Sequence, residues 1–187
     1  MDLSTRELIL QAARWSAQAH GYGGLNYREL AKDVGIKAAS IHYYFPSKAD
    51  LGVAVAQRYR EDVAEALAAL SEEVPSPIER LRRYSDFYRI ALQSDNRMCL
   101  GSFMAAEYDD LPGAVAAEMQ AFADINVAWL RTQLLEASLV TVESSQRRAG
   151  AIFAAIAGAQ LLARSRGDIY LFDSIIESYY EAGLLPM

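Results

Sequence analysis

Residues 26–51 read NYRELAKDVGIKAASIHYYFPSKADL, and they contain the clearest signals for helix ends in the chain. It predicts a short helix from about Tyr27 to Val34, which ends at Gly35 because glycine readily adopts the left-handed conformation of a helix terminus. A second short helix fits between Ala38 and Tyr44, since Pro46 blocks its continuation. The stretch therefore predicts two short helices joined by a glycine-containing turn.

Four helix starts are marked by a short polar residue that is followed three positions later by an acid. In this capping-box pattern the polar side chain accepts from free amides of the first turn, and the acid reaches back to the amide of the capping residue. The four pairs are Ser4 with Glu7, Asn26 with Glu29, Ser47 with Asp50, and Ser76 with Glu79. They predict helices that begin immediately after each polar residue.

The rest of the chain also has helical spacing. Neither an Asn-Gly hairpin nor sustained alternation of polar and apolar residues indicates a strand. A linker is expected at Ser71–Ser76, and a break at Pro112 and Gly113. Besides the two short helices, the expected helices cover residues 5–20, 47–70, 77–94, 99–109, 114–137, 143–166 and 168–182. We therefore expect an all-α fold of about nine helices.

Composition limits the class of protein. The chain has 187 residues, of which 52% are hydrophobic and 22% charged, as in a globular protein and unlike a fibrous or disordered one. The single cysteine, Cys99, cannot form an internal disulfide, and the first residues lack the apolar run of a signal peptide, so a cytoplasmic location is expected. The longest uncharged apolar run, Ala149–Ala163, is shorter than the roughly 20 residues that cross a bilayer. No membrane partner is expected.

Charge is distributed unevenly along the chain. The net charge is −6, yet residues 1–60 carry a net charge of +3 and residues 61–187 carry −9. All three lysines, Lys32, Lys37 and Lys48, lie in the first part. A cationic N-terminal part favours an anionic partner such as DNA.

The two short helices match a helix-turn-helix, whose second helix enters the major groove of DNA. His42, Tyr43 and Tyr44 are adjacent in that helix, so they cannot all face one core and at least one must be exposed. An exposed tyrosine hydroxyl can donate to phosphate, and Lys48 adds a cation in the first turn of the next helix. We expect a phosphate clamp. The alternative is that the tyrosines pack inside and Lys48 is merely solvated.

These residues resemble the TetR family of transcriptional regulators. The resemblance covers residues 9–55 and rests on the segments 26–36 and 40–51, in which a short recognition helix ends in His-Tyr-Tyr-Phe and Ser-Lys opens the next helix. It implies a helix-turn-helix DNA-binding domain at residues 1–50, linked through the helix 47–70 to a helical effector-binding and dimerisation domain at residues 51–187.

The resemblance also implies a function. Such a protein is expected to be a cytoplasmic homodimeric repressor that binds a palindromic double-stranded DNA operator and is released by a small-molecule effector. It would be no enzyme and would need no cofactor or metal. By the same resemblance, Lys37, Ala38, Ala39 and Ser40 face the groove, and Tyr27 and Arg28 approach the DNA from the preceding helix. Tyr27 departs from the family, where Thr is more common, and Arg28 can also be a solvated charge. The full expected DNA-binding set is Tyr27, Arg28, Lys37, Ala38, Ala39, Ser40, His42, Tyr43, Tyr44 and Lys48.

The expected effector pocket consists of apolar and aromatic residues of the second domain, any of which can instead be a core residue. They are Phe87, Tyr88, Cys99, Phe103, Met104, Tyr108, Phe122 and Trp129. The stretch around Cys99 resembles a subgroup of the family that includes electrophile-responsive repressors. A thiol sensor acting through Cys99 is therefore an alternative, and inert packing of this thiol is the other.

The helix 143–166 carries a stripe of small residues, Gly150, Ala154 and Gly158, that lets another helix approach closely. By the resemblance, this helix and the last one pair with a second copy of the chain. The expected interface residues are Phe153, Ile156, Gln160, Leu161, Ile175 and Tyr179. The alternative is close packing inside one chain.

Two other classes of protein compete with a regulator. An enzyme lacks a candidate site, because the chain has only two histidines, no metal-ligand cluster and no glycine-rich phosphate loop. A helical interaction module that never binds DNA would leave the clustered lysines and adjacent aromatic residues unexplained.

Overall fold

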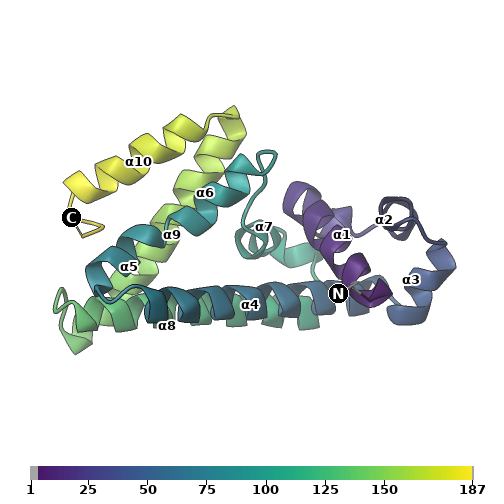
Figure 1. Cartoon of the computed structure of the whole chain (residues 1–187), viewed down its shortest axis with the longest axis horizontal. Helices are drawn as coiled ribbons and strands as arrows, with labels where there is room; N and C mark the ends of the chain where they lie inside the picture. Colours follow the sequence, from purple (N-terminus) through teal and green to yellow (C-terminus); the bar gives the residue numbers. More distant parts are fainter. Residues whose placement is uncertain (1–3, 187) are drawn as a thin grey trace. The chain divides into compact units, whose positions relative to one another are not determined.

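The computed structural model describes residues 4–186, and within this range the chain is helical and contains no strand (Figure 1). The expected all-α class is confirmed. The helices are α1 (Thr5–His20), α2 (Tyr27–Val34), α3 (Ala38–Tyr44), α4 (Lys48–Glu73), α5 (Pro77–Arg83), α6 (Asp86–Gln93), α7 (Leu100–Ala106), α8 (Gly113–Glu136), α9 (Val142–Arg166) and α10 (Ile169–Glu181). Two short 3-10 turns, η1 (Gly21–Gly24) and η2 (Tyr108–Asp110), complete the described chain.

The first three helices have the bounds that the sequence predicts, because their ends depend on local chemistry. The Asn26 side chain accepts from the amides of Arg28 and Glu29 at the start of α2. Gly35 ends that helix in the left-handed conformation, with φ 75° and ψ 32°.

The capping pairs differ in one respect from the expected pattern. All four polar side chains accept from the first turn, and of the four predicted pairs it is Ser47 with Asp50 that also has the reciprocal bond, in which Asp50 accepts from the Ser47 amide at 2.9 Å. Glu29 and Glu79 pair instead with Lys32 and Arg83, at 2.8 Å and 3.0 Å. The two glutamates thus stabilise their helices through cations one turn further on.

Two expected segments are different in the structure. The helix α4 continues to Glu73, so the linker to α5 is only three residues long. The helix ends there because Pro75 disfavours a helical conformation of the preceding residue, Val74. The expected helix 77–94 is interrupted between α5 and α6. At this interruption the Ser85 hydroxyl donates to the Arg82 carbonyl at 3.2 Å, a local bond that competes with the regular helical pattern.

The chain divides into two compact units. The first comprises the chain up to Asp62 together with Leu100–Phe122, and the second comprises Val63–Cys99 together with the chain from Ala123 onward. The helices α4 and α8 contribute residues to both units. The functional boundary expected at residue 50 stays a prediction.

In the first unit, Ile9, Leu30, Ile41 and Leu51 are completely buried and hold α1, α2, α3 and the start of α4 together. On its surface, Asp62 accepts from both Arg14 and Arg58 at 2.8 Å, which ties α1 to α4.

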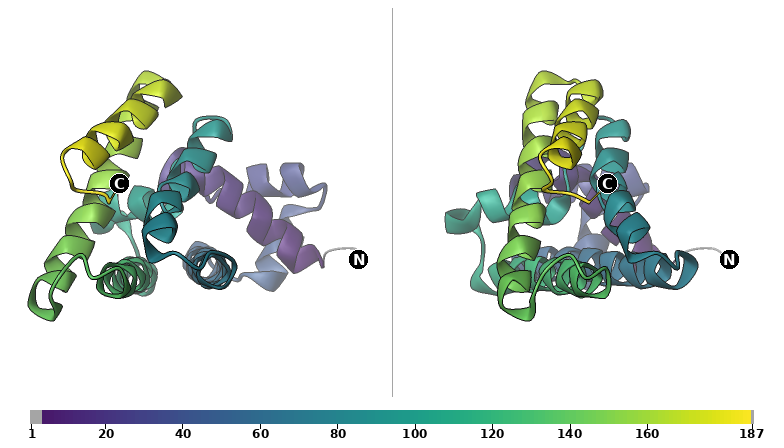
Figure 2. Two further views of the ribbon diagram at one scale, coloured as in Figure 1. Left: turned by 60° about the vertical axis from the view of Figure 1, so that its left-hand side comes forward. Right: turned by 90° about the vertical axis from the view of Figure 1, so that its left-hand side faces the viewer.

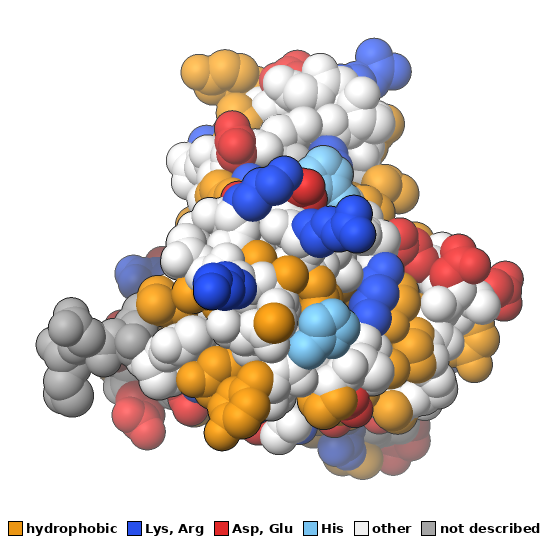
Figure 3. Space-filling view, turned by 90° about the vertical axis from the view of Figure 1, so that its right-hand side faces the viewer, with side chains coloured by type: hydrophobic (Ala, Val, Ile, Leu, Met, Phe, Trp, Pro, Cys, Tyr) orange, Lys and Arg blue, Asp and Glu red, His pale blue; other side chains and the backbone are white. Residues whose placement is uncertain are grey.

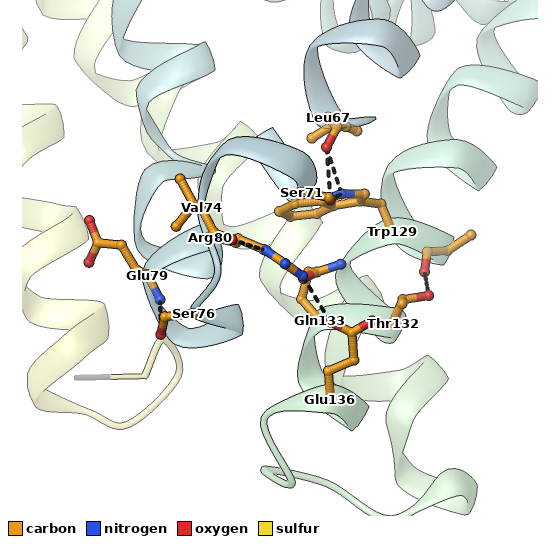
Figure 4. A network of polar contacts seen from close by, with 11 residues as sticks. Leu67, Ser71, Val74, Ser76, Glu79, Arg80, Trp129, Thr132, Gln133 and Glu136 are labelled. Carbon is orange, nitrogen blue, oxygen red and sulfur yellow. Dashed lines mark hydrogen bonds and ion pairs between the residues drawn. The ribbon is translucent and has the colours of Figure 1, made fainter. Parts of the chain in front are cut away.

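In the second unit, Trp129 and Arg80 connect the end of α4 with α5 and α8 (Figure 4). The Trp129 indole donates to the Leu67 carbonyl at 3.1 Å and to the Ser71 hydroxyl at 2.9 Å. Arg80 donates to the carbonyl of Val74, and also to Gln133 and Glu136 of α8, each at 2.9 Å.

The helices α9 and α10 pack side by side in the second unit (Figure 2). None of the helices in residues 4–186 combines the length and the apolar character that crossing a bilayer requires.

Candidate nucleic-acid interface

The helices α2 and α3 are anchored by apolar residues on one side, which leaves their polar side outward. Leu30 of α2, Ile41 of α3 and the following Phe45 are buried. The other face of the pair carries the exposed residues Arg28, Lys37, Ala39, His42, Tyr43 and Tyr44, with Ala38 and Ser40 half-buried. In Figure 3 this end of the molecule presents Lys, Arg and His side chains around hydrophobic ones.

The two adjacent tyrosines of α3 are both exposed. Tyr43 is 82% exposed and Tyr44 38%, and their rings meet edge to face with centroids 5.2 Å apart. Neither tyrosine is therefore a core residue. Both present an aromatic ring with a hydroxyl to solvent on the outer side of the second helix.

Tyr27 has a different role from the one that the sequence suggests. Its hydroxyl donates to the Phe45 carbonyl at 2.8 Å, and its ring lies 4.5 Å from that of His42. Burial raises the pKa of Tyr27 to about 12, with smaller contributions from Asp50 and Tyr22. The hydroxyl is thus engaged within the chain. Tyr27 positions the end of α3 against α2 and does not offer this group to phosphate.

Two lysines of the first unit have contrasting surroundings. Lys32 is bound to Glu29 at 2.8 Å, whereas the ammonium of exposed Lys48 lies over the ring of Tyr22, 4.4 Å from its centroid. The sequence pattern did not single out Tyr22. Its signal is an aromatic residue inside the glycine-rich run Gly21–Gly24, next to the start of the helix-turn-helix.

A shallow hollow of about 520 Å³ joins the starts of α2, α3 and α4. Its lining brings together several of the expected DNA-contact residues from different helices. It is lined by Gly23, Leu25, Asn26, Tyr27, Arg28, Ala38, His42 and Lys48. The surface can therefore hold the phosphate groups of a polyanion between Arg28 and Lys48, beside the rings of Tyr27 and His42.

The residues expected to line an effector pocket fall in two different units. In the first unit Met104 and Phe122 are buried, Phe103 is half-buried, and Tyr108 is 60% exposed. Phe87, Tyr88, Cys99 and Trp129 belong to the second unit.

The centre of the aromatic group in the second unit is Tyr84, which the sequence analysis missed. Its ring stacks on Trp129 at 5.6 Å and lies 5.8 Å from that of Tyr88 and 6.4 Å from that of Phe87. Its hydroxyl donates to Asn126 at 2.7 Å, and burial raises its pKa. These contacts make the aromatic group a part of the core of the second unit. The polar centre of the group is the bonded hydroxyl of Tyr84.

Cys99 is 4% exposed, and its backbone amide donates to the Gln160 side chain at 3.0 Å. A thiol so deeply buried is poorly accessible to a reagent in solution. The burial favours the packing role over the sensing role.

Two of the expected interface residues lie inside the chain. Ile156 and Gln160 are completely buried, and the Gln160 amide donates to the Tyr88 carbonyl at 2.7 Å. A surface for a second copy therefore excludes both. Leu161 is 57% exposed, and Phe153, Ile175 and Tyr179 are half-buried.

The small-residue stripe of α9 is open to solvent. A Cβ atom added at Gly150 or Gly158 would meet nothing within 4 Å, and Ala154 between them is exposed. The alternative for this stripe was close packing inside the chain. The open space at both glycines excludes it, because no other helix within residues 4–186 packs against them.

Metal chemistry has no candidate in the described part of the chain, where no three His, Cys, Asp or Glu residues are grouped to hold an ion.

The fold and the outward face of α2 and α3 define a helix-turn-helix protein. A family profile described as "Bacterial regulatory proteins, tetR family" matches residues 9–55.

Solved structures extend this likeness over almost the whole chain. A TetR transcriptional regulator from Legionella pneumophila is 32% identical with a TM-score of 0.90, covering 97% of this chain and 99% of that one. A TetR-family regulator from Agrobacterium tumefaciens is 30% identical with a TM-score of 0.88, covering 95% and 96%. The chain belongs to the TetR family, as its sequence resemblance implied.

Among named relatives, the HTH-type transcriptional regulator RutR of Escherichia coli is 26% identical over 140 residues, which make up 68% of this chain and 62% of RutR. The matched segments span between 43% and 62% of the curated relatives.

Proposed function

We propose that this protein is a cytoplasmic, homodimeric DNA-binding repressor, and not an enzyme, that a small molecule releases from its operator. The observation that carries the proposal is the outward side of α3 and the start of α4, where Tyr43, Tyr44 and Lys48 are all exposed. Family membership supports it.

In the proposed complex α3 lies in the major groove. The hydroxyls of Tyr43 and Tyr44 and the ammonium of Lys48 donate to phosphate oxygens beside the groove. Arg28 and Lys37 reach guanine edges, and the Ala39 methyl contacts thymine. Ala38, Ser40 and His42 complete the proposed contact set. Tyr27 makes no contact with DNA in this proposal and instead positions the end of α3 through its bond to the Phe45 carbonyl.

Dimerisation would place two copies of α3 on one side of the duplex. The exposed stripe of α9 together with Leu161 and the partly exposed Phe153, Ile175 and Tyr179 forms the proposed interface. Two recognition helices about one turn of DNA apart select a two-fold-related operator. A monomer would lose half of the contacts.

Release of the dimer from its operator needs an effector that prefers one of two conformations. In the preferred conformation the distance between the two α3 helices does not match the two half-sites of the operator. Such a molecule shifts the population away from DNA by no more than its differential affinity for the two conformations. Within the second unit, the proposed contacts come from the aromatic side chains Phe87, Tyr88 and Trp129.

Operator binding tests the proposal directly. We expect Tyr43→Ala and Lys48→Ala each to weaken binding at least about tenfold for each half-site, and so about a hundredfold or more for the dimer, since a hydrogen bond to a charged group contributes about 1.5–3 kcal/mol. Lys48→Ala should also reduce the slope of log affinity against log salt by about two per dimer, because each lost phosphate contact accounts for about 0.9. The measurement is a titration of selected genomic fragments, including the upstream region of the protein's own gene.

Lys32→Ala is the matched control, because this lysine is already paired with Glu29. It should change the affinity and the slope much less. Wild-type protein that binds none of the fragments would refute the proposed function, and a Lys48→Ala slope equal to that of the wild type would remove Lys48 from the clamp.

The oligomeric state provides a second test. Leu161→Lys places a charge on the proposed interface at a side chain that is exposed in the single chain, so it should convert the dimer to a monomer without unfolding it. Leu139→Lys, at a side chain 45% exposed outside that interface, should remain a dimer. Light scattering measures both masses, and identical masses for the two variants would place the interface elsewhere.

A further inference from the structure

We propose that Tyr22 is a positioning residue for DNA binding, whose ring holds the ammonium of Lys48 toward the phosphate and whose own place is fixed by Glu107. This inference rests on the proposed function of the surface around α3 and the start of α4. It adds Tyr22 of η1 and Glu107, which follows α7, to the residues of this surface.

The ring of Tyr22 restrains Lys48 before DNA arrives. The ammonium lies 4.4 Å from the ring centroid, inside the distance of about 6 Å over which a cation is attracted to an aromatic face. Lys48 is exposed, so the side of the ammonium away from the ring remains open for a phosphate. A lysine has several rotamers in solution, and fixing it in advance lowers the entropy lost on binding.

The absence of a side chain at Gly52 of α4 leaves the space that the Tyr22 ring occupies. A Cβ at Gly52 would lie 2.8 Å from Cε2 of Tyr22 and 3.1 Å from Cγ2 of Val115, distances too short for any other residue without displacement. Gly52 is one turn after Lys48 and therefore on the same side of the helix. The ring thus rests on α4 at Gly52 and faces the cation one turn earlier.

Glu107 fixes the backbone that carries the ring. The Tyr22 amide donates to the Glu107 carboxylate at 2.6 Å, a short bond to a charged acceptor. The neighbouring Gly21 has a φ of 63°, and a Cβ there would occupy the position of the same carboxylate. The turn between α1 and α2 is therefore built around a side chain from a segment 85 residues further along the chain.

A side chain that only filled space at position 22 would be replaceable by any apolar residue of similar size. The attraction between a ring face and a cation requires an aromatic residue. Phenylalanine keeps the face, and leucine removes it. The two substitutions therefore separate a packing role from a positioning role.

The test is a double-mutant cycle on operator affinity with full-length protein and a fixed operator fragment. Tyr22→Leu should weaken binding about three- to tenfold in the wild type and have almost no effect in the Lys48→Ala background. Tyr22→Phe should bind like the wild type. In the Lys32→Ala background, Tyr22→Leu should cause its full loss, because Lys32 does not lie on the ring.

Thermal unfolding shows whether Tyr22→Leu is folded. If it is not, Glu107→Ala provides the same test, since it frees the turn while leaving the ring and the lysine in the chain, and its loss of affinity should likewise vanish with Lys48→Ala. Equal losses in both lysine backgrounds, or a Tyr22→Phe loss as large as that of Tyr22→Leu, would overturn the inference. Wild-type protein that binds no fragment would instead overturn the function on which it rests.

Discussion

Replacing Gln160 by glutamate is expected to destabilise the protein by about 3 kcal/mol or more at pH 7, because it places a charge in a completely buried site. One end of the Gln160 amide accepts from the Cys99 amide and the other donates to the Tyr88 carbonyl. A carboxylate keeps the first bond but turns a second oxygen toward the carbonyl. The native residue thus joins α6, α9 and the segment before α7.

The loss should depend on pH. Burial raises the pKa of the new carboxyl group in the folded state above its value of about 4.3 in the unfolded chain. The destabilisation is therefore complete above the folded-state pKa and shrinks as the pH falls through it, since a protonated carboxyl can donate to the Tyr88 carbonyl as the amide does.

Urea unfolding at pH 7 and at pH 5 measures this difference. Gln146→Glu is the matched control, because it makes the same substitution at an exposed position of the same helix, and it should have little effect at either pH. If Gln160→Glu were as stable as the wild type but monomeric, Gln160 would belong to the dimer interface after all.

A methyl group added at Gly101 is expected to destabilise the protein by about 1–3 kcal/mol, through overpacking of the core. The added Cβ would overlap the ring of Phe122, which is 3% exposed and cannot move into solvent without opening the core. The better helix propensity of alanine, about 1 kcal/mol, offsets only part of this cost.

Gly113→Ala isolates the steric contribution. Gly113 also lies in a helix, and a Cβ there meets nothing within 4 Å, so the melting temperature should stay the same or rise slightly. Gly101→Ala should lower it by several degrees. Equal melting temperatures for the two variants would mean that α7 and α8 are packed less tightly than the structure describes.

The sequence determined the elements whose physical causes are local. The ends of α1, α2 and α3 follow from Ser4, Asn26, Gly35 and Pro46, because caps, left-handed glycines and proline act within a few residues. The exposure of Tyr43 was also predictable, since three adjacent side chains of a helix cannot share one buried face.

Tertiary structure decided which helix face is buried and which distant groups meet. Helical spacing placed Ile156, Gln160 and Leu161 near one another on α9, yet the first two are buried and the third is exposed, since this depends on where the neighbouring helices lie. The bond of Tyr27 to Phe45 and the meeting of Tyr22 with Lys48 and Glu107 join segments 18 to 85 residues apart. Such contacts form only when the folded chain brings these segments together, and no local pattern encodes them.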